Sequence, residues 1–376
     1  MIVFNKPYIT ELEKEYVLDA INRGNLHGDG YYTKLVSQFI ENRFKTNKAL
    51  MTTSCSSALD MAALMLDLKE GDEVIMPSYT FVSTANAVVL RGAKPVFVEI
   101  CEKTLNIDPK HIENKITKNT KAIFVVHYAG VSCDMNKVMA IAQRHNLKVV
   151  EDAAQSVNAK YKDKYLGTIG DIGCYSFHNT KNYTSGEGGA ILINYDDALA
   201  KTAEIIREKG TNRNQFFRGE VDKYTWVDVG SSYLPSDILC ALLWAQFTKI
   251  DEIQKKRKYI YDSYYMGLKS MEKGGKLRLP IIPDYCESNY HMFYILLNSN
   301  KERDYLMDKL KANDIYTVFH YIPLHTSPMG EKLGYKFGDL PKTEDLSSRL
   351  LRLPMYAGLE YEDLQIIIEN INRILN

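Results

Sequence analysis

The sequence predicts an α/β protein in which helices cover both faces of a mostly parallel central sheet, followed by a smaller α+β domain. Between residues 48 and 152, five short β-branched runs alternate with helical patterns, as in βα units around a parallel sheet. The chain has 376 residues, 45% of them hydrophobic, which is enough for one large and one small domain. A helical pattern from Asp237 turns from apolar to charged midway, as in a helix that connects two lobes.

The expected elements follow one another in chain order. Strands are expected at 48–53, 73–76, 95–100, 122–126 and 148–152, with helices between them at 55–66, 81–91, 109–116 and 135–145. Two further strands are expected at 173–178 and 188–194, and after the connecting helix a strand at 291–297, a helix at 301–312, a strand at 316–322 and two terminal helices. We place the domain boundary near residue 248, so the large domain covers 1–248 and the small domain 249–376.

Composition and charge exclude several classes of protein. Forty-seven Lys and Arg balance 47 Asp and Glu, so no global field attracts nucleic acid or an acidic membrane surface. No apolar run approaches the roughly 18 residues of a membrane span, and the N-terminus lacks a signal-peptide pattern. The six cysteines form no C-x-x-C pair, which disfavours a zinc ribbon or a disulfide framework. We expect a cytoplasmic protein without nucleic acid, metal or membrane partners.

Residues that follow the strands are the candidates for a binding site, because ligands of parallel sheets bind beyond the carboxyl ends of the strands. Small hydroxyl residues at 53–57, among them Ser56 and Ser57, precede a helix whose free N–H groups favour an anion such as a phosphate. The alternative is that they only cap this helix. Phe81 follows the next strand and is either a platform for a flat aromatic ligand or a core residue.

Two carboxylates and a lysine are further candidates. Glu151 and Asp152 end a strand and are expected to point into the crevice, where Asp152 can hold a protonated ring nitrogen, bind a metal or cap the next helix. The metal is the least favoured, since no His or Cys stands at ligand spacing. Lys181 precedes the glycine-rich stretch 185–189, and although most lysines are surface charges, one in such a crevice loop suits Schiff-base chemistry.

A cluster of cations and aromatic residues lies further along the chain. It is either a solvated face or a local seat for a nucleotide pyrophosphate. Its members are Arg207, Lys209, Arg213, Arg218, Lys223 and Tyr224.

Taken together, in this order and spacing, the motifs resemble the DegT/DnrJ/EryC1/StrS family of sugar-nucleotide aminotransferases over essentially the whole chain. The most specific parts are EDAAQ at 151–155, GCYSFHNTKN at 173–182 and FHYIPLH at 319–325. The resemblance implies the aspartate aminotransferase fold (fold type I), pyridoxal 5'-phosphate (PLP) as cofactor, and a homodimer with active sites at the subunit interface. The segment 207–234 is most similar to members that aminate dTDP-4-keto-6-deoxyglucose with L-glutamate for surface glycans such as enterobacterial common antigen.

The resemblance also assigns roles to individual residues. Lys181 corresponds to the Schiff-base lysine, Asp152 to the partner of the pyridinium nitrogen and Phe81 to the residue that stacks on the ring. The remaining expected cofactor residues are Ser56, Ser57 and Ser176 at the phosphate and Gln155 and His178 near the ring substituents. The expected substrate residues are Arg213, Arg218, His320, Tyr321 and His325. Many relatives have Asn where this chain has Leu234, and that Asn contacts the phosphate of the neighbouring subunit; Ser231 or Ser232 is the candidate replacement.

Three alternatives predict other residues. A sugar dehydratase of the same family has His in place of the lysine, and a non-catalytic sugar-nucleotide-binding relative is expected to lose Lys181 or Asp152. A nicotinamide dehydrogenase needs G-x-G-x-x-G after a strand. This chain keeps both residues and lacks that glycine motif, so an aminotransferase is favoured. The keto sugar, the aminated carbon and the nucleotide stay open.

Overall fold

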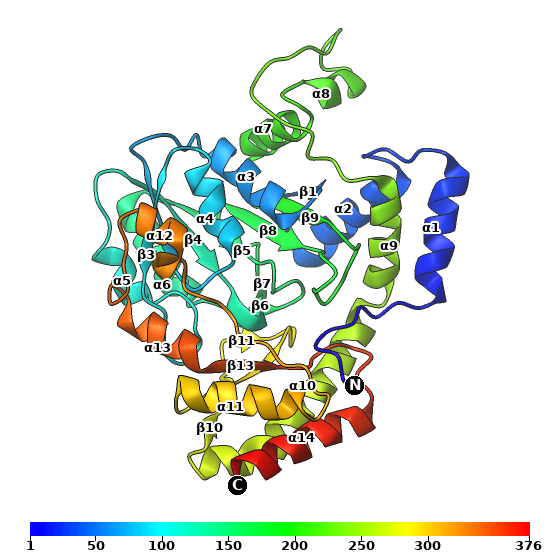
Figure 1. Cartoon of the computed structure of the whole chain (residues 1–376). Coiled ribbons are helices and arrows are strands. Elements are labelled where there is room, and N and C mark those ends of the chain that lie inside the picture. The colour runs from blue at the N-terminus through cyan, green and yellow to red at the C-terminus, as the bar shows by residue number, and fades with distance from the viewer.

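The large predicted domain is built on a seven-stranded sheet, seen in the computed structural model of residues 1–376 (Figure 1). Every neighbouring pair of strands is parallel except the two pairs that involve β9. In sheet order the strands are β1 (Lys48–Thr52), β9 (Gly189–Ile193), β8 (Ile172–Ser176), β5 (Lys148–Asp152), β4 (Thr120–Val126), β2 (Glu73–Pro77) and β3 (Lys94–Val98). The predicted alternation of strands and helices is thus confirmed.

Helices cover both faces of this sheet because strand residues alternate between its two sides. In β2, Val74 and Met76 pack on one side, whereas Ile75 between them packs on the other. The first side carries α3 (Cys55–Met65), α4 (Val82–Val89) and α7 (Asp197–Arg207). The second side carries α5 (Pro109–Glu113), α6 (Met135–His145), α2 (Tyr31–Phe44) and α9 (Asp237–Thr248).

The first two helices lie outside the elements expected from the sequence. Helix α1 (Glu11–Arg23) lies beside α9 in Figure 1. At the start of α9, the buried Asp237 carboxylate accepts hydrogen bonds from the backbone N–H groups of Tyr32 (3.2 Å) and Thr33 (2.7 Å). Both donors belong to the first turn of α2, where free N–H groups and the helix dipole favour a negative charge. One carboxylate thereby fastens the start of α2 to the start of α9.

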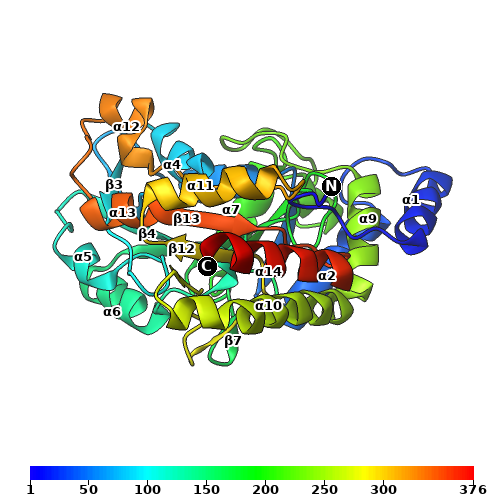
Figure 2. The same ribbon diagram turned by 60° about the horizontal axis from the view of Figure 1, so that its bottom comes forward.

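The C-terminal part of the chain forms a smaller α+β unit, which Figures 1 and 2 show below the main sheet and from its own side. Its antiparallel sheet and helices comprise β10 (Leu277–Arg278), β12 (Phe293–Leu297), β13 (Leu350–Leu353), α10 (Ile250–Lys273), α11 (Asn300–Lys311) and α14 (Tyr361–Leu375). Ile2 packs in the core of this unit and pairs with Ile315, so the first residues of the chain contact the smaller unit. The boundary near residue 248 remains our proposal for the domain division.

Two expected elements differ from the structure. The helical pattern that starts at Asp237 is interrupted at Lys249 (φ −114°, ψ 16°), which separates α9 from α10. The stretch 316–322 does not form a strand, and within it only Val318 pairs, with Arg352 of β13. The residues after Val318 instead place their rings against aromatic side chains of the large domain.

Short elements complete the fold. They are β6 (Lys160–Tyr161), β7 (Lys164–Tyr165), β11 (Cys286–Glu287), α8 (Arg213–Phe217), α12 (Pro328–Lys332), α13 (Pro341–Arg349), η1 (Tyr128–Gly130) and η2 (Leu324–Thr326).

The projecting segment, defined as residues 208–234, contains α8 and extends away from the sheet in Figure 1. Within this segment Phe217 is 66% exposed and Trp226 is 77% exposed. No helix of the structure is both long and apolar enough to cross a membrane.

Candidate active site

One cavity of about 530 Å³ lies beyond the carboxyl ends of the parallel strands. Both parts of the chain contribute to its lining, because β5, β8 and the loop after β8 come from the large domain and β13 comes from the smaller unit. Most of the predicted site residues line this cavity, namely Ser56, Phe81, Asp152, Gln155, Ser176, His178, Lys181, His320 and Tyr321. Residues that are far apart in the sequence therefore meet at one place, as the topology of parallel sheets requires.

Lys181 lies in the loop that joins β8 to β9. The loop is held by hydrogen bonds from Phe177 N–H to Gly188 O (2.8 Å) and from Ser185 N–H to Phe177 O (2.9 Å), and Gly186 adopts φ +83° at its turn. The half-buried Lys181 ammonium forms no ion pair in the structure. Burial lowers the pKa of Lys181, and nearby Asp152 partly opposes this shift. A lysine with a lowered pKa more readily supplies the neutral amine that acts as nucleophile or proton acceptor.

Asp152 is the last residue of β5 and is buried. One carboxylate oxygen accepts from the Thr84 hydroxyl (2.7 Å) and the other from the Ala154 backbone N–H (3.2 Å). Burial raises the pKa of Asp152, while these two donors and Lys181 oppose that shift. Each carboxylate oxygen has two lone pairs, so Asp152 retains the capacity to accept a further hydrogen bond from a cationic N–H in the cavity.

Hydroxyl groups gather at the N-terminus of α3. Ser54 caps the helix by accepting from the Ser57 backbone N–H (3.0 Å), and the Ser56 hydroxyl lies 2.6 Å from the Ser83 hydroxyl at the cavity wall. Ser176, at the end of β8, also lines the cavity. Hydroxyl donors and the positive end of an 11-residue helix together form a donor set suited to a phosphate.

The structure corrects the expectation for Ser57. Its hydroxyl contacts those of Thr53 (2.8 Å) and Ser54 (3.0 Å), and it does not line the cavity. Ser57 lies one residue beyond Ser56 on α3, and this rotation about the helix axis turns its side chain from the cavity into the capping network. The two readings of this motif, phosphate site and helix cap, therefore apply to different serines.

Aromatic and amide side chains form the side of the cavity that faces the smaller unit. Phe81 is 56% exposed at the start of α4, and its ring centroid lies 6.2 Å from that of Tyr321. The Tyr321 hydroxyl accepts from Gln155 Nε2 (3.2 Å), and the backbone N–H of Ala129 donates to Gln155 Oε1 (2.7 Å). His320 Nδ1 lies 3.2 Å from a tyrosine hydroxyl, and burial strongly lowers the pKa of His320, which favours a neutral ring.

His325 was expected on the substrate side, and the structure contradicts this expectation. The side chain is fully buried outside the cavity. Its Nδ1 lies 2.7 Å from the Ser78 hydroxyl and its Nε2 lies 2.8 Å from Glu344 Oε1. Since both ring nitrogens have partners, His325 connects η2 and α13 to the turn after β2 and has no free atom for a substrate.

The remaining predicted residues lie in the projecting segment and do not line the cavity of their own chain. Arg213 pairs with Glu208 (3.0 Å), and Arg218 pairs with Glu204 (2.8 Å) and Glu220 (2.6 Å). Ser232 forms a backbone bridge with Glu208. Within one chain these arginines are paired with acids and lie outside the cavity, so the structure does not bring them together with the other predicted site residues.

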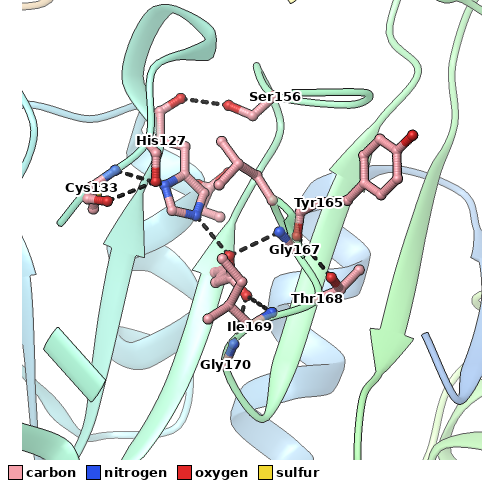
Figure 3. A network of polar contacts seen from close by, with 12 residues as sticks. His127, Cys133, Ser156, Tyr165, Gly167, Thr168, Ile169 and Gly170 are labelled. Carbon is pink, nitrogen blue, oxygen red and sulfur yellow. Dashed lines mark hydrogen bonds and ion pairs between the residues drawn. The ribbon is translucent and has the colours of Figure 1, made fainter. Parts of the chain in front are cut away.

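Glu151 was expected to point into the crevice together with Asp152, and this expectation is wrong. Consecutive strand residues face opposite sides of a sheet, and Glu151 points away from the cavity. Figure 3 shows its surroundings, in which the carboxylate accepts from the backbone N–H groups of Gly167 (2.8 Å), Ile169 (2.6 Å) and Gly170 (2.6 Å). His127 Nε2 lies 2.8 Å from the same carboxylate. Glu151 therefore holds the loop after β7 beneath the end of β5.

Two basic residues of the cavity are not among the site residues predicted from the sequence. His291 precedes β12 and contacts Asn182 through Nδ1 (2.9 Å), and burial lowers its pKa. Arg352 lies on β13 and lines the cavity from the smaller unit. One signal for Arg352 is present in the sequence, because it is the single polar residue of the strand LLRL.

A family model described as the DegT/DnrJ/EryC1/StrS aminotransferase family matches residues 7–372. The chain belongs to this family. It is 34% identical over 375 residues to GDP-perosamine synthase of Escherichia coli O157:H7, covering 98% of this chain and 96% of that protein. It is 35% identical over 335 residues to the spore coat polysaccharide biosynthesis protein SpsC of Bacillus subtilis, covering 87% and 85%.

A solved structure of the putative sugar aminotransferase Spr1654 from Streptococcus pneumoniae, in its PMP form, superposes with a TM-score of 0.93. Its identity to this chain is 25%, over 100% of this chain and 99% of that chain. The protein is therefore a PLP-dependent sugar aminotransferase with the predicted α/β fold, and the expected cofactor is confirmed.

Proposed function

We propose that the protein transfers the amino group of L-glutamate to dTDP-4-keto-6-deoxy-D-glucose, giving dTDP-4-amino-4,6-dideoxy-D-galactose and 2-oxoglutarate, as a dTDP-4-amino-4,6-dideoxygalactose transaminase. The observation that carries the aminotransferase chemistry is the meeting of Lys181 and Asp152 in one cavity with the hydroxyl cluster of α3. The similarity of segment 207–234 to enzymes with this substrate supports the choice of sugar. We place the reaction in the cytoplasm, in the synthesis of surface polysaccharide.

The residues of the cavity fit PLP. The α3 N-terminus with Ser56, together with Ser176, is the donor set for its phosphate, and Phe81 offers a ring at the mouth of the cavity. Gln155 and His178 are our candidates for contacts to the ring substituents. When bound, PLP supplies an electron sink for the pair left by breaking a C–H bond next to nitrogen. Asp152 strengthens this sink by accepting a hydrogen bond from the protonated ring nitrogen.

Lys181 has two tasks in this proposal. Its Nζ would form the covalent link to PLP. The Lys181 amine would also accept a proton from the substrate carbon and return it within the same cavity, as a general base and acid. The lowered pKa of Lys181 favours the neutral amine that accepts this proton. The Thr84 hydroxyl donates to the Asp152 carboxylate and so holds this carboxylate in position.

We further propose a homodimer in which each cavity is completed by the projecting segment of the partner subunit. The segment exposes Phe217 and Trp226, and such exposed aromatic side chains are enriched at protein interfaces. Phe81, at the mouth of the cavity, is also more than half exposed. In this arrangement Arg213, Arg218 and Ser232 line the cavity of the neighbouring subunit. Ser232 there takes the role of the Asn that many relatives have at the position of Leu234.

A second candidate substrate is a GDP-linked 4-keto sugar, because the relative from E. coli O157:H7 is named GDP-perosamine synthase. The experiment that separates the candidates supplies purified protein with PLP, L-glutamate and equal amounts of dTDP-4-keto-6-deoxyglucose and GDP-4-keto-6-deoxymannose. Product structures are then determined by nuclear magnetic resonance. Preferential formation of the dTDP product with an axial 4-amino group supports the proposal. A GDP product, or an equatorial amine, contradicts it.

A further inference from the structure

His291 is held at the edge of the cavity by contacts from both parts of the chain. It lies two residues before β12 and is buried. From α10 of the smaller unit, the Arg257 guanidinium donates to the backbone carbonyls of Tyr290 (3.0 Å) and His291. From the large domain, the side chain of Asn182 contacts Nδ1 of the ring (2.9 Å). Because Asn182 directly follows Lys181, this contact ties the Lys181 loop to the smaller unit.

The hydrogen bonds of Asn182 determine which nitrogen of His291 carries the proton. Asn182 Nδ2 donates to the carbonyl oxygen of Asn289 (2.8 Å), which can only accept, so Oδ1 of the same amide faces His291. Since Oδ1 is an acceptor, Nδ1 of His291 is the protonated nitrogen. Burial lowers the pKa of His291, and the positive charge of Lys181 acts in the same direction, so the ring is neutral. Nε2 consequently carries a free lone pair.

Nε2 has access to space that His291 shares with Lys181. Both residues line the main cavity and also a second, much smaller cavity of about 10 Å³. Within the protein the ring is hydrogen-bonded only through Nδ1, so Nε2 has no protein donor and no direct hydrogen bond joins it to Lys181. The small cavity has the volume of about one water molecule, and Ser176, Asn182 and Asn289 add further polar groups to its wall.

We propose that His291 is a positioning residue for Lys181, and that its Nε2 accepts a hydrogen bond from a single water that in turn accepts one from the Lys181 amine. This inference rests on the proposed role of Lys181. An acceptor at this place favours the form of the amine with more N–H groups, which is the protonated form. Burial and the positive charge of Arg352 act in the opposite direction and lower the pKa of Lys181. His291 therefore helps the lysine to retain the proton that it takes from the substrate carbon.

Other ionisable groups act on the same pair, and they are identical in all the variants compared below. Those that act on Lys181 are Cys55, Asp152 and Arg352. Those that act on His291, besides Lys181, are Arg257, His320 and Arg352. His178 and Glu187 also line the main cavity, where they lie 3.6 Å apart. A difference between variants at position 291 therefore reports the imidazole itself.

The test uses protein loaded with pyridoxamine 5'-phosphate, a form in which Lys181 is not linked to the cofactor. Traces of acetic anhydride are added at a series of pH values, and mass spectrometry measures acetylation of Lys181. Only the neutral amine reacts, so the midpoint of this profile measures the proton affinity of Lys181.

Two variants separate the ring nitrogens. His291→Asn keeps a donor near the position of Nδ1 and has no acceptor at the position of Nε2, so it should lower the midpoint by about one pH unit. His291→Gln places an amide oxygen near the position of Nε2 and should keep the wild-type midpoint. The control His145→Asn makes the same change at an exposed position on α6 and should have no effect.

A midpoint lowered in His291→Asn but not in His291→Gln supports the proposal. An unchanged midpoint in His291→Asn overturns it, as does an equal shift in both variants, which indicates that only the contact with Asn182 matters. If the thermal melt shows that His291→Asn does not fold, His291→Leu takes its place and the same comparison with His291→Gln decides. If borohydride fixes PLP to a lysine other than Lys181, the proposed role of Lys181 is wrong, whereas the labelling profiles still decide whether His291 acts on Lys181.

Discussion

Glu151 carries a buried carboxylate whose two oxygens serve four donors. Oε1 accepts from the backbone N–H groups of Ile169 and Gly170, and Oε2 accepts from Gly167 N–H and from His127 Nε2 (Figure 3). The imidazole donates through Nε2, because its Nδ1 accepts from a backbone N–H at 3.2 Å. A carboxylate has only acceptors and therefore matches this set of donors.

Glu151→Gln replaces one oxygen by an NH₂ group that cannot accept a hydrogen bond. The carbonyl oxygen of the glutamine can still serve Ile169 and Gly170, but Gly167 N–H and His127 Nε2–H then face another donor. Each buried donor left without an acceptor costs about 1–3 kcal/mol. We expect Glu151→Gln to lower the free energy of unfolding by about 4 kcal/mol, which is among the largest effects of single substitutions.

Equilibrium unfolding in urea, on PLP-loaded protein, measures this loss. The matched control is Glu369→Gln, which makes the same chemical change on the exposed side of α14 and should shift the free energy of unfolding by less than about 0.5 kcal/mol. A loss below about 1 kcal/mol for Glu151→Gln would refute the reasoning, since two buried donors that lose their acceptor must lower the free energy of unfolding by more than that.

Three further predictions concern the cavity. Asp152→Asn should fold and retain PLP but lose orders of magnitude in kcat, because a neutral amide cannot hold the ring nitrogen protonated; an unchanged kcat in steady-state assays excludes the role. Burial lowers the pKa of Lys181, so between that value and the ordinary value of about 10.4 the unfolded chain binds a proton that the folded chain lacks, and stability rises with pH. Without PLP, Lys181→Met should therefore be more stable than wild type at neutral pH, with an advantage that shrinks toward pH 10 in urea unfolding curves. Finally, mixing a Lys181→Ala chain with a chain inactivated at Ser232 should restore about a quarter of wild-type activity after random subunit exchange, since half of the dimers carry one intact site; exchange without recovery places Ser232 in its own chain's site.

The parallel part of the fold could be predicted because each of its strands is a short apolar run followed by a helical pattern. The same regularity located Asp152 and Lys181, since residues that follow parallel strands meet at one edge of the sheet. The first two helices were missed. Helix α2 begins after Gly30 and is held by Asp237, a contact across more than 200 residues that no local pattern reveals.

The errors at the site have similar physical causes. Glu151 and Asp152 are adjacent in the sequence but face opposite sides of β5, and the sequence does not say which of them faces the cavity. His325 lies in a motif that reaches the cavity through Tyr321, yet a buried acid at α13 and a serine after β2 occupy its ring. Arg352 is a single charge in a leucine-rich strand, and only the position of β13 relative to the large domain turns it into a cavity residue.

The central claim is that Lys181 is the residue that binds the cofactor and transfers the proton. Its most direct test is to treat PLP-loaded protein with borohydride, digest it and locate the cofactor by mass spectrometry of the peptides. We predict that the label is found on the peptide that contains Lys181, and that Lys181→Ala protein retains no covalent label and has no turnover. A label on another lysine, or a Lys181→Ala protein with normal turnover, would contradict the assignment.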